Sequence, residues 1–178
     1  LGDVYKRQVE RGMLCGDGIY TKKCSAWMEE RFHVGHVMLT TSCTHALEMA
    51  AYLSDIQPGD EVIIPEPCFV CYEPITTLSG GVPVHVPCRQ EDEFRLRPEA
   101  LKAAITPKTK LLIMPFPNNP TGAVMEREDL EAIAEVLRDT NVMVLSDEIY
   151  AELNYGLRPH VSIATPVSYT HLRAHETR

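Results

Sequence analysis

The strongest constraint on the fold is a strand–helix–strand order between residues 110 and 145. Residues 110–114 (KLLIM) and 141–145 (NVMVL) are short, mostly apolar runs, as expected for parallel strands covered on both faces. Between them, one face of an amphipathic helix is marked at the i, i+3, i+4, i+7 spacing by Leu130, Ile133, Ala134 and Leu137. The sequence therefore predicts a βαβ unit.

A polar cluster follows each of these two strands. The first is the turn 115–122 (PFPNNPTG), stiffened by its X-Pro steps, and the second is 146–150 (SDEIY). Carboxyl ends of parallel strands meet at one edge of a sheet, which is where open α/β sheets bind ligands. We therefore expect Asn119 and Asp147 to belong to one binding site.

The remaining chain repeats the alternation of strand and helix. Further strands are expected at 37–41, 61–65 and 82–86. Helices are expected at 21–32, at 45–53, before the Gly80-Gly81 pair and at 98–104, where proline opens the first turn. In the second helix the expected buried face is Ala46, Met49, Ala50 and Leu53. This order predicts an α/β fold with a doubly wound, mostly parallel sheet.

The two polar clusters, in this order and one helix apart, resemble the class I/II aminotransferases, which are fold type I enzymes that use pyridoxal 5'-phosphate (PLP). The resemblance implies an incomplete large domain of that fold. It also implies that Asp147 pairs with the protonated pyridine nitrogen, and that Asn119 and Tyr150 hydrogen-bond the ring 3-oxygen. A carboxylate keeps that nitrogen cationic, and a cationic ring acts as an electron sink.

Two earlier segments fit the same resemblance. Ser42-Cys43-Thr44 stands at a strand-to-helix junction, where a hydroxyl side chain caps the helix and the first N–H groups attract anions. The family implies that the amides of Cys43 and Thr44, with the Thr44 hydroxyl, hold the cofactor phosphate; a cap without a ligand is the alternative. Phe69 takes the position of the aromatic residue that stacks on the ring. Its alternative is an ordinary core residue.

The covalent part of the family's site is missing from this sequence. The resemblance implies a Schiff-base lysine and a substrate-binding arginine further along, whereas Lys102, Lys108 and Lys110 lie in other contexts. We therefore assign no catalytic residue and expect a fragment that is inactive by itself.

For the complete protein, the resemblance implies transfer of an amino group between an amino acid and a 2-oxo acid, by a homodimer. A nucleotide-sugar aminotransferase and a PLP-dependent carbon–sulfur lyase are the alternative enzymes. A translated assembly artefact without function is the alternative that is not an enzyme.

The ends and one internal join divide the chain further. Residues 1–8 and 167–178 back-translate to one transposase-type sequencing adapter in opposite senses, so both are expected to lie outside the fold. This leaves 9–166 as the partial large domain. Residues 9 to about 65 resemble DegT-type nucleotide-sugar aminotransferases. A chimera joined near 59–66 would explain the difference from the class I pattern downstream.

Composition excludes several other classes of function. The net charge of −8 disfavours binding to nucleic acid or to anionic membranes, and no apolar run is long enough to span a bilayer. Cys68-x-x-Cys71 lacks the second pair of ligands that a zinc site needs, so no metal is expected. Six cysteines without a visible secretory signal indicate reduced thiols and a cytoplasmic protein.

Overall fold

The computed structural model describes residues 6–7, 9–10, 12, 16–156 and 159–164, together with the backbone of 171–174. The chain separates into two compact units, Leu1–Thr41 and Ser42–Arg178. In the first unit, helix α2 (Ile19–Phe32) confirms the expected helix, although none of its residues is buried. The strand expected at 37–41 is wrong, because these residues pair with no described strand and Met38 is exposed.

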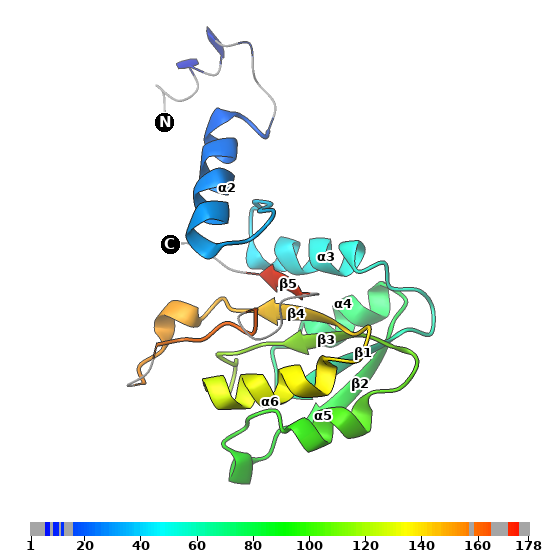
Figure 1. Ribbon diagram of the computed structural model, residues 1–178. Coiled ribbons are helices and arrows are strands. Elements are labelled where there is room, and N and C mark those ends of the chain that lie inside the picture. The colour runs from blue at the N-terminus through cyan, green and yellow to red at the C-terminus, as the bar shows by residue number, and fades with distance from the viewer. Residues whose placement is uncertain are drawn as a thin grey trace. The chain divides into compact units, whose positions relative to one another are not determined.

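The second unit is built on a parallel sheet (Figure 1). Its strands are β1 (Glu61–Glu66), β2 (Val82–Pro87), β3 (Thr109–Met114), β4 (Met143–Asp147) and β5 (His171–Ala174). They lie in the order β2-β1-β3-β4-β5, and each neighbouring pair is parallel. The predicted α/β fold with a parallel sheet is confirmed.

Helices cover both faces of this sheet, as a doubly wound fold requires. Helices α3 (Cys43–Leu53) and α4 (Tyr72–Leu78) pack with Val62, Ile64 and Leu145 in one hydrophobic core. Helices α5 (Pro98–Ala104) and α6 (Arg127–Leu137) share the other core with Ile63 and Val144. Single 3₁₀ turns at Gln90–Asp92 and Ala151–Leu153 complete the described elements.

Helix α6 has the face that its sequence predicts. All four residues of the predicted stripe are buried: Leu130, Ile133, Ala134 and Leu137. The helix begins at a capping box, in which the Glu126 side chain accepts from the backbone of Asp129, and Asp129 Oδ2 accepts from the Glu126 N–H at 3.0 Å. The βαβ unit between β3 and β4 is therefore present with the expected side of its helix on the sheet.

Helix α3 exists where it is expected, but the expected face is partly wrong. The helix buries Leu47 and Ala50, whereas Leu53 is exposed and Ala46 and Met49 are half-buried. Apolar residues surround most of this helix, so more than one stripe satisfies the helical spacing. Contact with the sheet and with α4 decides which stripe is covered, and the periodicity alone does not predict that contact.

Prolines occur in two strands. The pairing of β1 with β3 ends at Ile63, before Pro65, whose nitrogen carries no hydrogen to donate toward β3. Strand β2 lies at the end of the sheet order and contains Pro83 and Pro87. Proline is tolerated at such positions because an edge strand is paired on one side only.

Strand β5 lies within residues 167–178, which were expected to stay outside the fold. Its backbone pairs in parallel with β4, with Asp147 opposite Ala174. An apolar strand with an unpaired edge accepts the backbone of any extended segment that reaches it, because pairing uses N–H and C=O groups rather than particular side chains. The adapter origin of these residues stays a prediction.

Candidate functional site

Asp147, the last residue of β4, is the centre of the candidate site. Its side chain is only 4% exposed. The Tyr72 hydroxyl donates to Oδ2 at 3.0 Å, and the Ile149 N–H donates to Oδ1 at 3.3 Å. The thiol of Cys43 lies 3.8 and 3.9 Å from the two carboxylate oxygens. The carboxylate is thus held by groups from α3, from α4 and from the turn after β4.

Burial dominates the electrostatics of this cluster. It raises the pKa of Asp147, and the hydrogen bonds from Tyr72, Ile149 and Cys43 act in the opposite direction. The nearby charge of Glu148 raises the pKa of Asp147 further. Burial, followed by the charge of Asp147, also raises the pKa of Tyr72, so this phenol keeps its proton and remains a donor. Such a buried carboxylate is stabilised by a cationic or donating group on a ligand.

Asn119 of the first polar cluster contacts Tyr150 of the second. The Asn119 side-chain amide donates to the Tyr150 hydroxyl at 3.4 Å. The turn that carries Asn119 is braced by its neighbour: the Asn118 N–H donates to Ala123 O at 3.0 Å, and Asn118 O accepts from the Gly122 N–H at 2.9 Å. Gly122 has φ +72°, a left-handed conformation that glycine adopts without strain.

The N-terminus of α3 lies at the same edge of the sheet, as the contact between Cys43 and Asp147 shows. Ser42 is its N-cap, with Oγ accepting from the His45 N–H at 3.2 Å, so the expected hydroxyl cap is present. Thr44 is exposed in the first turn. Its proposed role toward a phosphate stays a prediction.

Phe69 is not an ordinary core residue, because 42% of it is exposed. Its ring meets the Tyr72 ring edge-on, with centroids 6.4 Å apart and an interplanar angle of 78°. Tyr72 therefore links Phe69 to Asp147. Sequence reasoning missed Tyr72, although its place three residues after Phe69, at the start of a helix, is a signal that could have singled it out.

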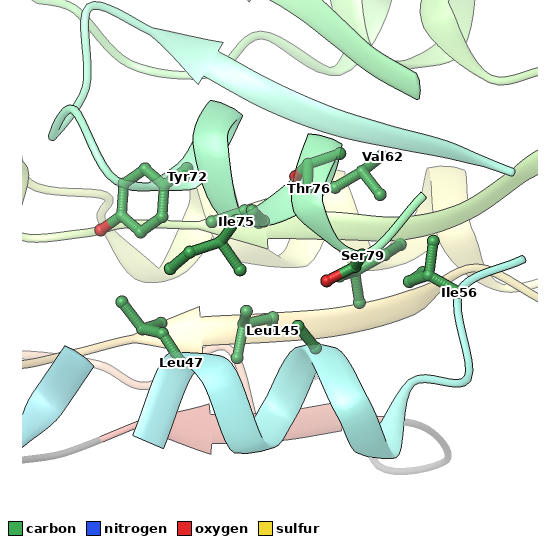
Figure 2. A pocket seen from close by; sticks show the side chains of 11 residues that line it. Leu47, Ile56, Val62, Tyr72, Ile75, Thr76, Ser79 and Leu145 are labelled. Atoms are coloured by element: carbon green, nitrogen blue, oxygen red, sulfur yellow. The ribbon is translucent and has the colours of Figure 1, made fainter. Parts of the chain in front are cut away.

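Three hollows accompany these residues. An open groove of about 780 Å³ is lined by the turn 117–126 and by residues of the segment 150–159, including Asn119 and Tyr150. A cavity of about 20 Å³ lies in the core between α3, α4 and the sheet, where Figure 2 shows Leu47, Ile75 and Leu145 around it. Its lining is almost wholly apolar, so we interpret it as a packing gap. A third hollow, of about 10 Å³, adjoins Glu148 and His160.

Two cysteines near the site, Cys68 and Cys71, are poor candidates for thiolate chemistry. Burial raises the pKa of Cys68 and of Cys71 to about 11. Within the described part of the chain, no group of three or more His, Cys, Asp or Glu side chains could hold a metal ion. Among the same residues, no helix combines the length and apolarity needed to cross a membrane.

The fold is an α/β domain whose polar residues gather at the carboxyl edge of a parallel sheet, the edge at which open α/β sheets bind ligands. The family model "Aminotransferase class I and II" matches residues 20–174, so the chain belongs to this family. The match runs through the polar clusters of Asn119 and Asp147.

Several relatives are aminotransferases. The chain is 46% identical over 129 residues to a probable N-acetyl-LL-diaminopimelate aminotransferase of Bacillus subtilis, covering 72% of this chain and 32% of the relative. It is 43% identical over 133 residues to an aspartate aminotransferase of Geobacillus stearothermophilus, covering 75% and 34%. The solved aromatic aminotransferase of Pyrococcus horikoshii matches with TM-score 0.73 and 37% identity, over 82% and 40%. The chain thus spans about a third of the length of these curated relatives.

Proposed function

We propose that the complete protein transfers an amino group between an amino acid and a 2-oxo acid, with pyridoxal 5'-phosphate as its cofactor. The observation that carries the proposal is Asp147, a buried carboxylate at the end of a central strand with a raised pKa. The names of the relatives support the reaction class, and the structure supports the placement of the binding residues.

The described donors and acceptors fit this cofactor. Asp147 offers a buried anionic acceptor for the protonated ring nitrogen. Asn119 and Tyr150, already in contact, offer donors for the ring 3-oxygen. The N-terminus of α3 offers Cys43 and Thr44 for the phosphate, since the first turn of a helix attracts anions. Phe69, partly exposed beside Tyr72, offers an aromatic face for the ring.

Bound at this site, the cofactor supplies an electron sink for a carbanion at the substrate α-carbon. Asp147 would hold the proton on the ring nitrogen, because an anionic partner favours the cationic form. Tyr72 fixes the orientation of that carboxylate through its 3.0 Å hydrogen bond. Asn119 and Tyr150 would hold the ring 3-oxygen, and Phe69 would exclude water from one face of the ring.

We also propose that the complete enzyme is a homodimer, as the family resemblance implies. We further propose that it is cytoplasmic, since its six cysteines suit a reducing compartment. We propose that residues 1–8 and 167–178 originate from a sequencing adapter. We also propose a join near 59–66 between a DegT-like and a class I segment. Back-translation of the two ends and the change of resemblance support them. Amplification across codons 40–90 of the source DNA tests the join, and one continuous product of this sequence would overturn it.

Titration of the 178-residue chain with PLP, followed by fluorescence and absorbance, tests the cofactor assignment. We expect saturable binding that weakens about tenfold or more in Asp147→Asn, since this substitution removes a charge-assisted hydrogen bond worth about 1.5–3 kcal/mol. Asp139→Asn changes the same residue type at an exposed position and should bind like the parent chain. A titration with pyridoxal, which lacks the phosphate, is a control that reports reaction of the aldehyde with surface lysines. Absence of saturable PLP binding, or equal binding by both variants, would refute the assignment.

A further inference from the structure

Glu148 is a second buried carboxylate, on the opposite face of the sheet from Asp147. Successive side chains of a strand point to opposite faces. Asp147 therefore faces the layer of α3 and α4, where it meets Cys43 and Tyr72. Glu148, the residue after β4, instead borders a hollow that is lined by Leu130 of α6. Glu148 is only 1% exposed, and the proposed function gives it no role.

Hydroxyl and imidazole groups surround the Glu148 carboxylate. Oε1 accepts from Ser146 Oγ at 2.9 Å and from Ser162 Oγ at 2.5 Å. Oε2 lies 3.1 Å from His160 Nε2. Two of these groups belong to the segment 159–164, so one side chain joins this segment to the end of β4.

The hollow beside this carboxylate is lined mainly by apolar residues. The adjoining hollow of about 10 Å³ is also lined by Met114, Phe116 and Ile163, and it is at the lower limit of the space that one water molecule needs. Protein donors must therefore compensate for most of the hydration that Glu148 loses. The contacts with segment 159–164 therefore help to hold the buried Glu148 carboxylate in place.

The imidazole of His160 is one of the groups that stabilise the Glu148 carboxylate. Among the described residues its buried Nδ1 atom has no hydrogen-bond partner, and its side chain is only 13% exposed. A proton on Nδ1 would be a buried donor without an acceptor. With its hydrogen on Nε2, the ring donates to Glu148 Oε2. We interpret His160 as a hydrogen-bond donor to Glu148 Oε2.

The backbone joins Glu148 to the candidate site. The Glu148 carbonyl accepts from the Ala151 N–H at 2.9 Å, and the next residue, Ile149, donates its N–H to Asp147 Oδ1 at 3.3 Å. Tyr150, which contacts Asn119, lies between Ile149 and Ala151. Displacement of Glu148 would therefore move the turn that carries both Asp147 and Tyr150.

We propose that Glu148, held by His160, Ser146 and Ser162, is a positioning residue that fixes the 147–151 turn and so aims Asp147 and Tyr150 at the cofactor. The proposal rests on the proposed function for the part that concerns the cofactor. The part that concerns the turn can be measured without any cofactor.

Amide hydrogen exchange in the cofactor-free chain tests the turn. In Glu148→Gln we expect the N–H groups of Ile149 and Ala151 to exchange about tenfold faster or more, while the amide of Leu112 in β3 changes less. Glu152→Gln, an exposed change in the same segment, should leave all three unaltered. Equal acceleration at all three amides, or no acceleration at Ile149 and Ala151, would overturn the proposal. If Glu148→Gln does not fold, Ser162→Ala removes one donor and leaves the carboxylate in place, and the same comparison decides.

Two substitutions of His160 separate a donor from a counter-ion. His160→Gln keeps a neutral N–H donor, whereas His160→Ala removes it. We expect slow exchange at Ile149 and Ala151 to be retained in the Gln variant and lost in the Ala variant. Equal loss in both would show that His160 acts through its charge and would overturn this assignment.

PLP titration of the same variants completes the test. We expect Glu148→Gln to weaken PLP binding by about tenfold or more, since small misplacement of binding groups has large effects, with Glu152→Gln unchanged. If the parent chain does not bind PLP, the proposed function fails, and the exchange data alone still decide the role of Glu148 in the turn. If the parent binds and Glu148→Gln binds equally well, the positioning proposal is overturned while the proposed function stands.

Discussion

Replacement of Tyr72 by phenylalanine should destabilise the chain in a way that depends on pH. The substitution keeps the buried ring and removes one hydroxyl, which donates to Asp147 Oδ2 at 3.0 Å. A hydrogen bond to a charged group contributes about 1.5–3 kcal/mol, and one between neutral groups about 0.5–1.5 kcal/mol. Since Asp147 is buried, the larger range applies when its carboxyl is ionised.

The direction of the pH dependence follows from the raised pKa of Asp147. The native state holds this proton more tightly than the unfolded chain, whose carboxyl has the ordinary pKa of 3.8. The stability linked to this group is therefore fully present below about pH 3.8 and is lost as the pH rises through the native pKa. The Tyr72 hydrogen bond lowers that pKa and limits the loss. Tyr72→Phe should therefore lose about 1.5–3 kcal/mol near pH 7 and less near pH 4.

Urea unfolding followed by far-UV circular dichroism, between pH 4 and pH 8, measures this difference. Tyr52→Phe removes the same hydroxyl from a side chain that is 85% exposed, and should change the free energy of unfolding by less than about 0.5 kcal/mol. In an Asp147→Asn background, the effect of Tyr72→Phe should fall to the neutral range at every pH. A loss that is independent of pH, or that persists in full without the carboxylate, would refute the reasoning.

Three further outcomes test the packing and the thiols. Ile133→Ala, at a fully buried position of α6, should lower the free energy of unfolding by about 2–5 kcal/mol, and Leu78→Ala, at an exposed position, by less than about 0.5 kcal/mol, both measured by urea unfolding. Val62→Ile adds one methylene beside the core cavity of Figure 2. It should raise the free energy of unfolding by up to about 0.8 kcal/mol, which is detected as a higher melting temperature. A melting temperature below that of the parent chain would show that the cavity cannot accept the methylene. Exposed Cys24 should react with a thiol reagent at pH 7.5 well before Cys71, whose pKa is about 11, and mass spectrometry of the labelled peptides reports the order.

The βαβ unit could be predicted from sequence because several independent signals agree there. The spacing of Leu130 and Ile133 admits one helical face, and the runs beside it are too short and too apolar for another interpretation. The positions of Asn119 and Asp147 follow from this unit, since the end of a parallel strand fixes the edge of the sheet on which they lie. Local pattern and tertiary structure coincide in this part of the chain.

Other features depend on contacts that no local pattern contains. The buried stripe of α3 is chosen by the sheet, and the run at 37–41 has strand-like composition but no described partner strand. Tyr72 lies 75 positions before Asp147 in sequence, so their hydrogen bond emerges only when α4 packs on the sheet. His160 and Glu148 likewise meet through a loop whose course the sequence does not determine.

The prolines of β2 affect how the sheet can associate with other chains. The N–H groups of Val82 and Cys88 donate to Asp60 and Glu66, on the β1 side, so the residues at odd positions between them direct their nitrogens away from β1. Of those three positions, 83, 85 and 87, only His85 carries an N–H, because the other two are prolines. An incoming strand would find a single donor along this rim. This edge is therefore a poor template for strand addition, so backbone-mediated self-association of the chain is disfavoured at β2.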